Sequence, residues 1–98
     1  MRWIEIIQLR TTGTTALSAL IDELRCSLEG ELVEVGIYRH ATVESDLSVH
    51  LVHETDGVAL PDRTLGHRLA ATLEEHGLVN HSLWTEVHRS RTSDRRPS

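Results

Sequence analysis

The amino-acid sequence predicts a single α+β domain, in which a four-stranded antiparallel sheet carries two helices on one face. Its length of 98 residues suits one domain, since domains usually span ~50–200 residues. Apolar residues alternate at period two in some segments and recur at three- and four-residue spacing in others. These segments follow one another in the order strand, helix, strand, strand, helix, strand.

The first strand is expected over residues 3–10, which mix β-branched and apolar side chains and end at a turn-forming Thr/Gly run. Apolar residues occupy both alternating sets, so both faces of this strand should be at least partly buried. The first helix follows from about Thr15 to Glu29, with Gly30 beyond its end in a left-handed conformation. Its apolar stripe consists of Leu17, Leu20, Ile21, Leu24 and Leu28.

A hairpin is expected next, around a loop near residues 41–45. The second helix should begin with Pro61 in its first turn and end at Gly77 in a Schellman motif. The last strand should cover residues 78–88. The hairpin positions expected to face the helices are Val33, Val35, Ile37, Leu47, Val49 and Leu51.

This order of elements is a split β-α-β unit repeated once, as in ferredoxin-like folds. Right-handed crossovers then give the strand order 4-1-3-2, with all neighbours antiparallel and both helices on one face. The opposite face is mixed in character, and a sheet face of that kind suits a covered surface better than open water. We therefore expect a homodimer through the helix-free face. The side chains expected there include Leu32, Glu34, Gly36, Tyr38, Ser48, His50, Val52, Glu54, Leu78, Asn80, Ser82, Trp84 and Glu86.

Charge and composition exclude several classes of protein. The net charge is −5, and the tail at 89–98 holds four Arg and one Asp, so residues 1–88 carry −8. Such a domain does not favour nucleic acid, and the aromatic signature of RNA-binding sheets is missing. The domain is expected over residues 1–88, with a disordered Arg-rich tail after it.

The amino-terminal segment indicates neither secretion nor membrane insertion. Its apolar run is interrupted by Glu5 and Gln8, so it lacks the apolar stretch of a signal peptide. No segment reaches the ~18 apolar residues of a membrane span. The single cysteine, Cys26, cannot form an internal disulfide. A cytoplasmic location is expected.

His50 is the candidate catalytic residue, because the hairpin register places it opposite Gly36, where a missing side chain leaves space for a ligand. Imidazole exchanges protons near neutral pH. The alternative is a histidine hydrogen-bonded within a dimer contact. Tyr38 and Trp84 suit a flat ligand or a subunit interface equally, and Asn80 either orients a ligand or pairs across the sheet.

The seven histidines do not predict a metal site. His50 and His53 project from opposite faces of a strand. Leu51 also stands where the zinc motif of metalloproteases has Glu. We expect no metal and no cofactor.

The four strands, two helices and the closing segment Gly77-Leu78-Val79-Asn80-His81-Ser82-Leu83-Trp84 together resemble the dimeric α/β-barrel superfamily. The nearest group is the antibiotic-biosynthesis-monooxygenase-like proteins, and the resemblance covers residues 1–88 at the level of topology and pattern. It implies that two sheets pair into a barrel that binds a small organic molecule. Members resembling this plan oxidise without metal or flavin, typically using Asn, Trp and Tyr, whereas a haem-degrading branch uses Asn, Trp and His. This chain has those residue types in Asn80, Trp84, Tyr38 and His50 but no Asn in the first strand, so no catalytic role is transferred.

Two functions follow as hypotheses. The first is a cytoplasmic homodimer that binds a small organic ligand near Tyr38, His50, Asn80 and Trp84, with cofactor-independent oxygenation as its enzymatic version. The second is a non-catalytic interaction or ligand-sensing module, in which the same residues join two sheets. A regulatory amino-acid-binding domain is a third and weaker reading, because such modules usually accompany an enzyme domain.

Overall fold

A computed structural model describes residues 2–12, 16–31, 33–54 and 64–90 of the chain. The elements are the strands β1 (Arg2–Thr11), β2 (Glu34–Arg39), β3 (Asp46–Glu54) and β4 (Gly77–Thr85), the helices α1 (Leu17–Leu28) and α2 (Leu65–Leu73), and the 3₁₀ turn η1 (Glu74–His76). The predicted order of elements is therefore confirmed. Most of the Arg-rich tail, residues 91–98, lies outside the described residues.

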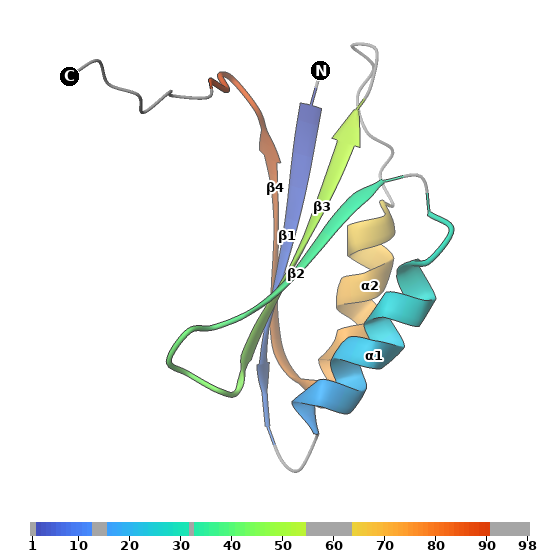
Figure 1. Ribbon diagram of the computed structural model, residues 1–98, viewed down its shortest axis with the longest axis vertical. Coiled ribbons are helices and arrows are strands. Elements are labelled where there is room, and N and C mark those ends of the chain that lie inside the picture. Colours follow the sequence, from blue (N-terminus) through green and yellow to red (C-terminus); the bar gives the residue numbers. More distant parts are fainter. Residues whose placement is uncertain (1, 13–15, 32, 55–63, 91–98) are drawn as a thin grey trace, which may run out of the picture.

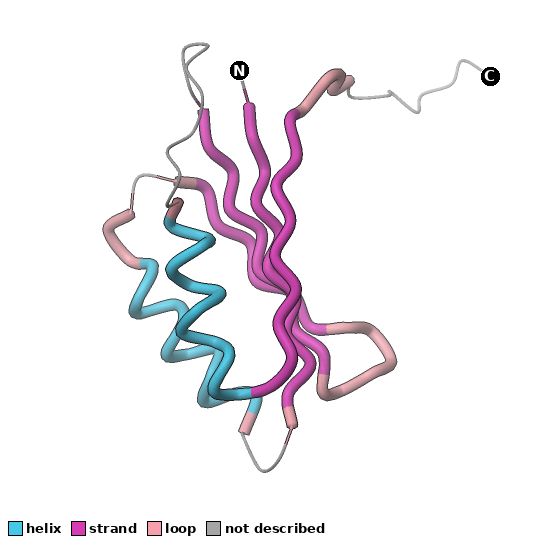
Figure 2. The backbone as a smooth tube through the Cα atoms, turned by 180° about the vertical axis from the view of Figure 1, so that it is seen from behind, coloured by secondary structure: helices cyan, strands magenta, loops and turns pink. Residues whose placement is uncertain are grey.

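The four strands form one antiparallel sheet in the order β2-β3-β1-β4, which is the predicted order. Both helices lie on the same side of this sheet (Figures 1 and 2). We call the helix-covered side the inner face and the helix-free side the outer face. The longest strand, β1, lies in the interior of the sheet, where β3 and β4 pair with it along nearly its whole length.

The core lies between the inner face and the helices, and it is aliphatic because the chain has no Phe. The hairpin positions predicted to face the helices do so: Leu47, Val49 and Leu51 are buried, and Val33, Val35 and Ile37 pack against the core. β1 turns Ile7 and Leu9 inward. Its Ile4 and Ile6 lie on the outer face and are half-buried, so both faces of β1 are partly buried, as predicted.

The helix ends differ in part from the prediction. Gly30 has the positive φ expected beyond α1. α2 begins at Leu65, later than predicted, because Thr64 is extended and caps it by accepting the N–H of His67. Residues 55–63, which include Pro61, lie outside the described residues.

The carboxyl end of α2 is not a Schellman motif. The chain tightens into η1, and Gly77 then takes φ 156° and ψ −153°. A Cβ at Gly77 would overlap the backbone of Arg10, so the glycine lets β4 start directly beside β1. β4 ends at Thr85, three residues before the predicted end of that strand at His88.

Candidate functional site

The outer face arranges the predicted site residues in cross-strand rows. His50 lies opposite Gly36, as the hairpin register predicted. Trp84 lies at the β4 edge of the sheet. The three rows are Glu34-Val52-Ile4-Trp84, Gly36-His50-Ile6-Ser82 and Tyr38-Ser48-Gln8-Asn80. All five predicted site residues therefore share one face, but they are spread across it.

His50 is in contact with two side chains of the hairpin. Its ring centroid lies 4.7 Å from that of Tyr38, with the two planes inclined by 51°. Its Nε2 lies 3.1 Å from the hydroxyl of Ser48. The ring of Tyr38 occupies the space above Gly36, since a Cβ there would fall 2.5 Å from the Tyr38 hydroxyl. The glycine thus gives room to a tyrosine ring, and the space beside His50 is not open.

Trp84 and Asn80 also have partners within the outer face. The indole N–H of Trp84 donates to the hydroxyl of Ser82 at 2.9 Å, and the ring is 58% exposed. The Asn80 amide donates to the Gln8 side-chain oxygen at 3.4 Å. Tyr38 is 54% exposed. The rings of Tyr38 and Trp84 are thus exposed to solvent on this face. The polar side chains of Ser82, Gln8 and Asn80 already have hydrogen-bond partners there.

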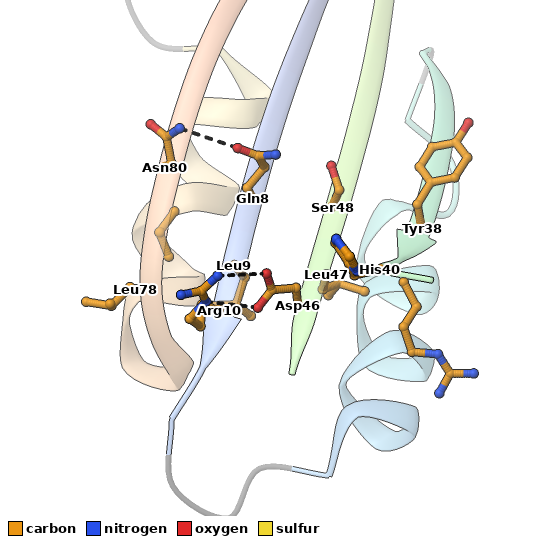
Figure 3. A pocket seen from close by; sticks show the side chains of 12 residues that line it. Gln8, Leu9, Arg10, Tyr38, His40, Asp46, Leu47, Ser48, Leu78 and Asn80 are labelled. Carbon is orange, nitrogen blue, oxygen red and sulfur yellow. Dashed lines mark hydrogen bonds and ion pairs between the residues drawn. The ribbon is translucent and has the colours of Figure 1, made fainter. Parts of the chain in front are cut away.

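A cavity of about 430 Å³ opens on the outer face at the end of the sheet where the hairpin turns (Figure 3). Tyr38 and Asn80 border it, whereas His50, Gly36 and Trp84 do not. It lies over the row that contains Gln8 and Ser48, which present an amide and a hydroxyl between the tyrosine and the asparagine. The remaining lining residues are Leu9, Arg10, Arg39, His40, Asp46, Leu47, Leu78 and Val79.

An ion pair crosses the floor of this cavity. The Nε of Arg10 donates to Asp46 Oδ1 at 3.0 Å, and a terminal nitrogen of Arg10 donates to Oδ2 at 3.2 Å. These hydrogen bonds from Arg10 lower the pKa of Asp46. A second ion pair, Arg2 with Glu54 at 2.9 Å, lies at the other end of β1. Charged pairs therefore flank the apolar middle of β1 on the outer face.

A second cavity of about 680 Å³ lies between α1 and the edge strand β2. Its floor is formed by Leu28, Val35 and Ile37. Cys26 borders it and is exposed.

The inner face contains a charged cluster that the sequence did not predict. Glu5 on β1 is 0% exposed although it is an acid in the centre of the sheet. Its Oε1 accepts from His53 Nε2 at 2.7 Å, and its Oε2 accepts from His81 Nε2 at 2.7 Å. The hydroxyl of Thr64 donates to Oε2, and the N–H of Gly66 donates to Oε1 at 3.1 Å. We call these five residues the Glu5 cluster.

The Glu5 cluster holds an ionised carboxylate. Burial alone would raise the pKa of Glu5, but hydrogen bonds from Thr64, His81, His53 and the Gly66 N–H outweigh burial and lower it. A carboxylate only accepts, so both histidines donate through Nε2. Each ring therefore presents Nδ1 to its surroundings. Side-chain exposure is 13% for His53 and 24% for His81, so both rings are close to solvent.

The Glu5 cluster could have been predicted from the alternation of inward and outward residues along β1, β3 and β4. Glu5 occupies the same alternating set as Ile7 and Leu9, the inward set of β1. His53 and His81 stand on the inward sets of their strands, each two register positions from the residue that pairs with Glu5. An acid in a core position predicts partners, because a buried charge is costly unless it is paired. The sequence interpretation used Glu5 only as an interruption of an apolar run.

Comparison of the chain with family models, with curated proteins and with solved structures gave no match. Among the described residues, no group of three or more His, Cys, Asp or Glu side chains is arranged to hold a metal ion. Within the same residues, neither helix is long and apolar enough to cross a membrane.

Proposed function

We propose that the protein is a cytoplasmic homodimer of the ferredoxin-like, dimeric α/β-barrel type, which pairs two outer faces and binds a small organic molecule in the outer-face cavity. The single observation that carries this proposal is the cavity of about 430 Å³ on the sheet face opposite α1 and α2, the helices of the described residues. Its volume lies in the range typical of ligand pockets, roughly 300–1,000 Å³.

The outer face has the composition expected of a subunit interface. Ile4 and Ile6 form its apolar middle on β1, and the ion pairs Arg2 with Glu54 and Arg10 with Asp46 stand at its two ends. Interfaces commonly combine an apolar centre with a polar rim, and they are enriched in Tyr, Trp and Arg. A second copy of this face would cover Tyr38 and Trp84, which are both more than half exposed in one chain.

The cavity lining indicates the kind of ligand. Tyr38 and Leu78 supply apolar walls, whereas Gln8, Ser48 and Asn80 supply amide and hydroxyl groups that can orient polar substituents. The charges of Arg10 and Asp46 neutralise each other. A small planar molecule with a few hydrogen-bonding groups fits this lining best.

The test of the dimer is its mass in solution. Sedimentation equilibrium between 1 and 100 µM, roughly the range in which specific homodimers assemble, should report two chains. Ile6→Glu places an unpaired charge in the middle of the paired outer faces and should give single chains that remain folded. The matched control is Ala71→Glu, which adds the same charge at an exposed position of α2 and should leave the dimer intact. Single chains for the unmodified protein would refute the dimer.

The test of the cavity uses 1-anilinonaphthalene-8-sulfonate as a planar aromatic probe. We expect saturable binding that Ser48→Trp abolishes, because the indole fills the cavity. Ser82→Trp is the control, since Ser82 lies on the same face and outside the cavity lining. Equal binding to both variants would place the probe elsewhere.

A catalytic version assigns proton transfer to His50 during cofactor-independent oxygenation of an electron-rich phenol. The phenol itself supplies the electrons: one atom of O2 enters the ring to give a quinone, and the other leaves as water. Ser48 supports it, because its hydroxyl borders the cavity and lies 3.1 Å from His50 Nε2, so it can pass a proton between a bound ligand and the His50 ring. Oxygen consumption with such phenols should require His50, and His50→Ala should lose turnover while the dimer remains. Turnover that persists in His50→Ala would exclude His50 as the group that transfers the proton.

The alternative is a non-catalytic dimeric interaction or ligand-sensing module. Hydrogen bonds within the outer face favour it: Trp84 is satisfied by Ser82, and Asn80 by Gln8. Side chains that are already hydrogen-bonded to each other suit a contact between two sheets at least as well as they suit substrate binding. Binding of the probe without oxygen consumption, in a protein that is dimeric, would support this alternative.

A further inference from the structure

The Glu5 cluster joins the sheet to the beginning of α2 through one charge. Glu5 and its two histidines come from three adjacent strands, β3, β1 and β4. Thr64 and Gly66 come from the amino-terminal end of α2. A Cβ at Gly66 would overlap the Glu5 carboxylate, so only glycine allows the helix to approach this closely. Neither of the two cavities described above is lined by any of these residues. The arrangement therefore has the features of a conformational device rather than of a ligand site.

We propose that the Glu5 cluster is a pH-responsive contact that controls how firmly the amino-terminal end of α2 is held on the sheet. The hydroxyl of Thr64 donates to Glu5 and at the same time accepts the N–H of His67 at 3.1 Å, so the helix cap depends on the same carboxylate. Four donors converge on Glu5, and they are satisfied only while it is ionised.

The titratable groups that face Glu5 are histidines. His53 approaches it from β3 and His81 from β4. On α2, His67 makes an edge contact with His81 at 6.0 Å between ring centroids. No titratable group of α1 or β2 has a described contact with this carboxylate.

The response comes from Glu5 itself. Its pKa is lowered by hydrogen bonds from Thr64, His81, His53 and the Gly66 N–H, which outweigh burial, so it stays ionised down to a pH below the ordinary Glu value of 4.5. Once the pH falls through the lowered value, protonation removes an acceptor that Thr64 and Gly66 of α2 need. The attachment of α2 should thus be firm while Glu5 is ionised and loosen in stronger acid.

Amide hydrogen exchange of the full chain, followed by NMR and corrected for the intrinsic pH dependence of exchange, tests this directly. The reporters are the N–H groups of Gly66 and His67, which donate to Glu5 and Thr64. Leu73, at the other end of α2, is the internal reference. From pH 6 to pH 3 we expect protection of the two reporters to fall by about fivefold relative to Leu73, the size expected for the loss of one such hydrogen bond.

Glu5→Gln supplies the decisive comparison, because an amide does not titrate in this range. In this variant the same acidification should leave the protection of Gly66 and His67 unchanged relative to Leu73. An equal fall in both proteins, or reporters that follow Leu73 in the unmodified protein, would overturn the proposal.

A milder pair of variants applies if Glu5→Gln does not fold. His81→Asn removes one of the hydrogen bonds that lower the pKa of Glu5 and keeps the carboxylate, so the loss of protection should begin at a higher pH. His88→Asn is the matched control, because His88 is exposed and lies outside the cluster, and it should leave the response unchanged. An unchanged response in His81→Asn would also overturn the proposal.

Discussion

The inner and outer faces of the sheet place polar side chains under opposite conditions. On the inner face, Glu5 is fully buried, and four donors from three other elements satisfy it. On the outer face, Tyr38 and Trp84 are more than half exposed, and the hydrogen bonds of Trp84 and Asn80 are made with neighbours on the same face. The inner face needs its polar contacts for folding, because its polar groups are buried. The polar groups of the outer face can bind water instead.

This difference indicates where substitutions will act. A buried polar group left without its partner loses hydrogen bonds and is not compensated by water. An exposed group that loses a partner turns to solvent. Changes at the inner face should therefore alter folding, and changes at the outer face should alter association and binding. Each of the following predictions tests one side of this division.

The largest effect is expected for Glu5→Ala. This substitution leaves His53, His81, Thr64 and Gly66 without their common acceptor in a buried position. Each buried donor left without its acceptor typically costs about 1–3 kcal/mol in the free energy of unfolding, and Thr64 and Gly66 are both buried. Urea unfolding monitored by circular dichroism should show a loss of this size. Glu23→Ala, an exposed glutamate on α1, should change the free energy by less than about 0.5 kcal/mol. Equal effects of the two substitutions would contradict the structural role of Glu5.

The second effect concerns the outer face and assumes the proposed dimer. Trp84→Ala removes an exposed indole that the partner would bury, and truncation of such a residue often costs about 2 kcal/mol or more of binding free energy. The dissociation constant of the dimer should rise roughly 30-fold, as measured by sedimentation equilibrium. Unfolding of the single chain should hardly change. Val87→Ala serves as the control, because Val87 is exposed and follows the end of β4. An unchanged dissociation constant in Trp84→Ala would mean that the dimer interface does not include the β4 edge.

The third prediction is the pH dependence of global stability. The folded state lowers the pKa of Glu5, so its contribution to stability is fully present above the ordinary value of 4.5 and is lost as the pH falls through the folded value. The difference in unfolding free energy between the unmodified protein and Glu5→Gln should therefore shrink below about pH 4.5. Urea unfolding at pH 7, 4 and 3 measures it. A difference that stays constant across this range would mean that Glu5 is not ionised in the folded protein.

Much of the fold was predictable, because alternation and helical spacing are local signals. The strand order, the inward set of the hairpin and the pairing of Gly36 with His50 all follow from such patterns. The start of α2 was predicted too early, since Pro61 offered a helix-start signal and Thr64 turned out to be the cap. Two competing start signals within a few residues cannot be separated by a local pattern.

The candidate site was less predictable, because it depends on where side chains from different elements meet. The sequence indicated that Gly36 lies beside His50, but the rotamer of Tyr38 decides whether that space is open. The two histidine partners of Glu5, His53 and His81, lie 48 and 76 residues away along the chain. Such contacts follow from strand register, and the register of β4 with β1 was not assigned from the sequence.

The smallest effect is expected for Gly36→Ala, which tests how the outer face is packed. The new Cβ would fall 2.5 Å from the Tyr38 hydroxyl, so the tyrosine ring must move. Because that ring is exposed, it can swing into solvent, and the cost should stay near 1 kcal/mol, the lower end of the range for overpacking. The ring contact with His50 should be lost, which shifts the His50 ring resonances in NMR spectra. In a Tyr38→Leu background the same substitution should cost much less. If both backgrounds respond equally, the tyrosine ring does not rest on Gly36, and the outer face is more open beside His50 than the structure indicates.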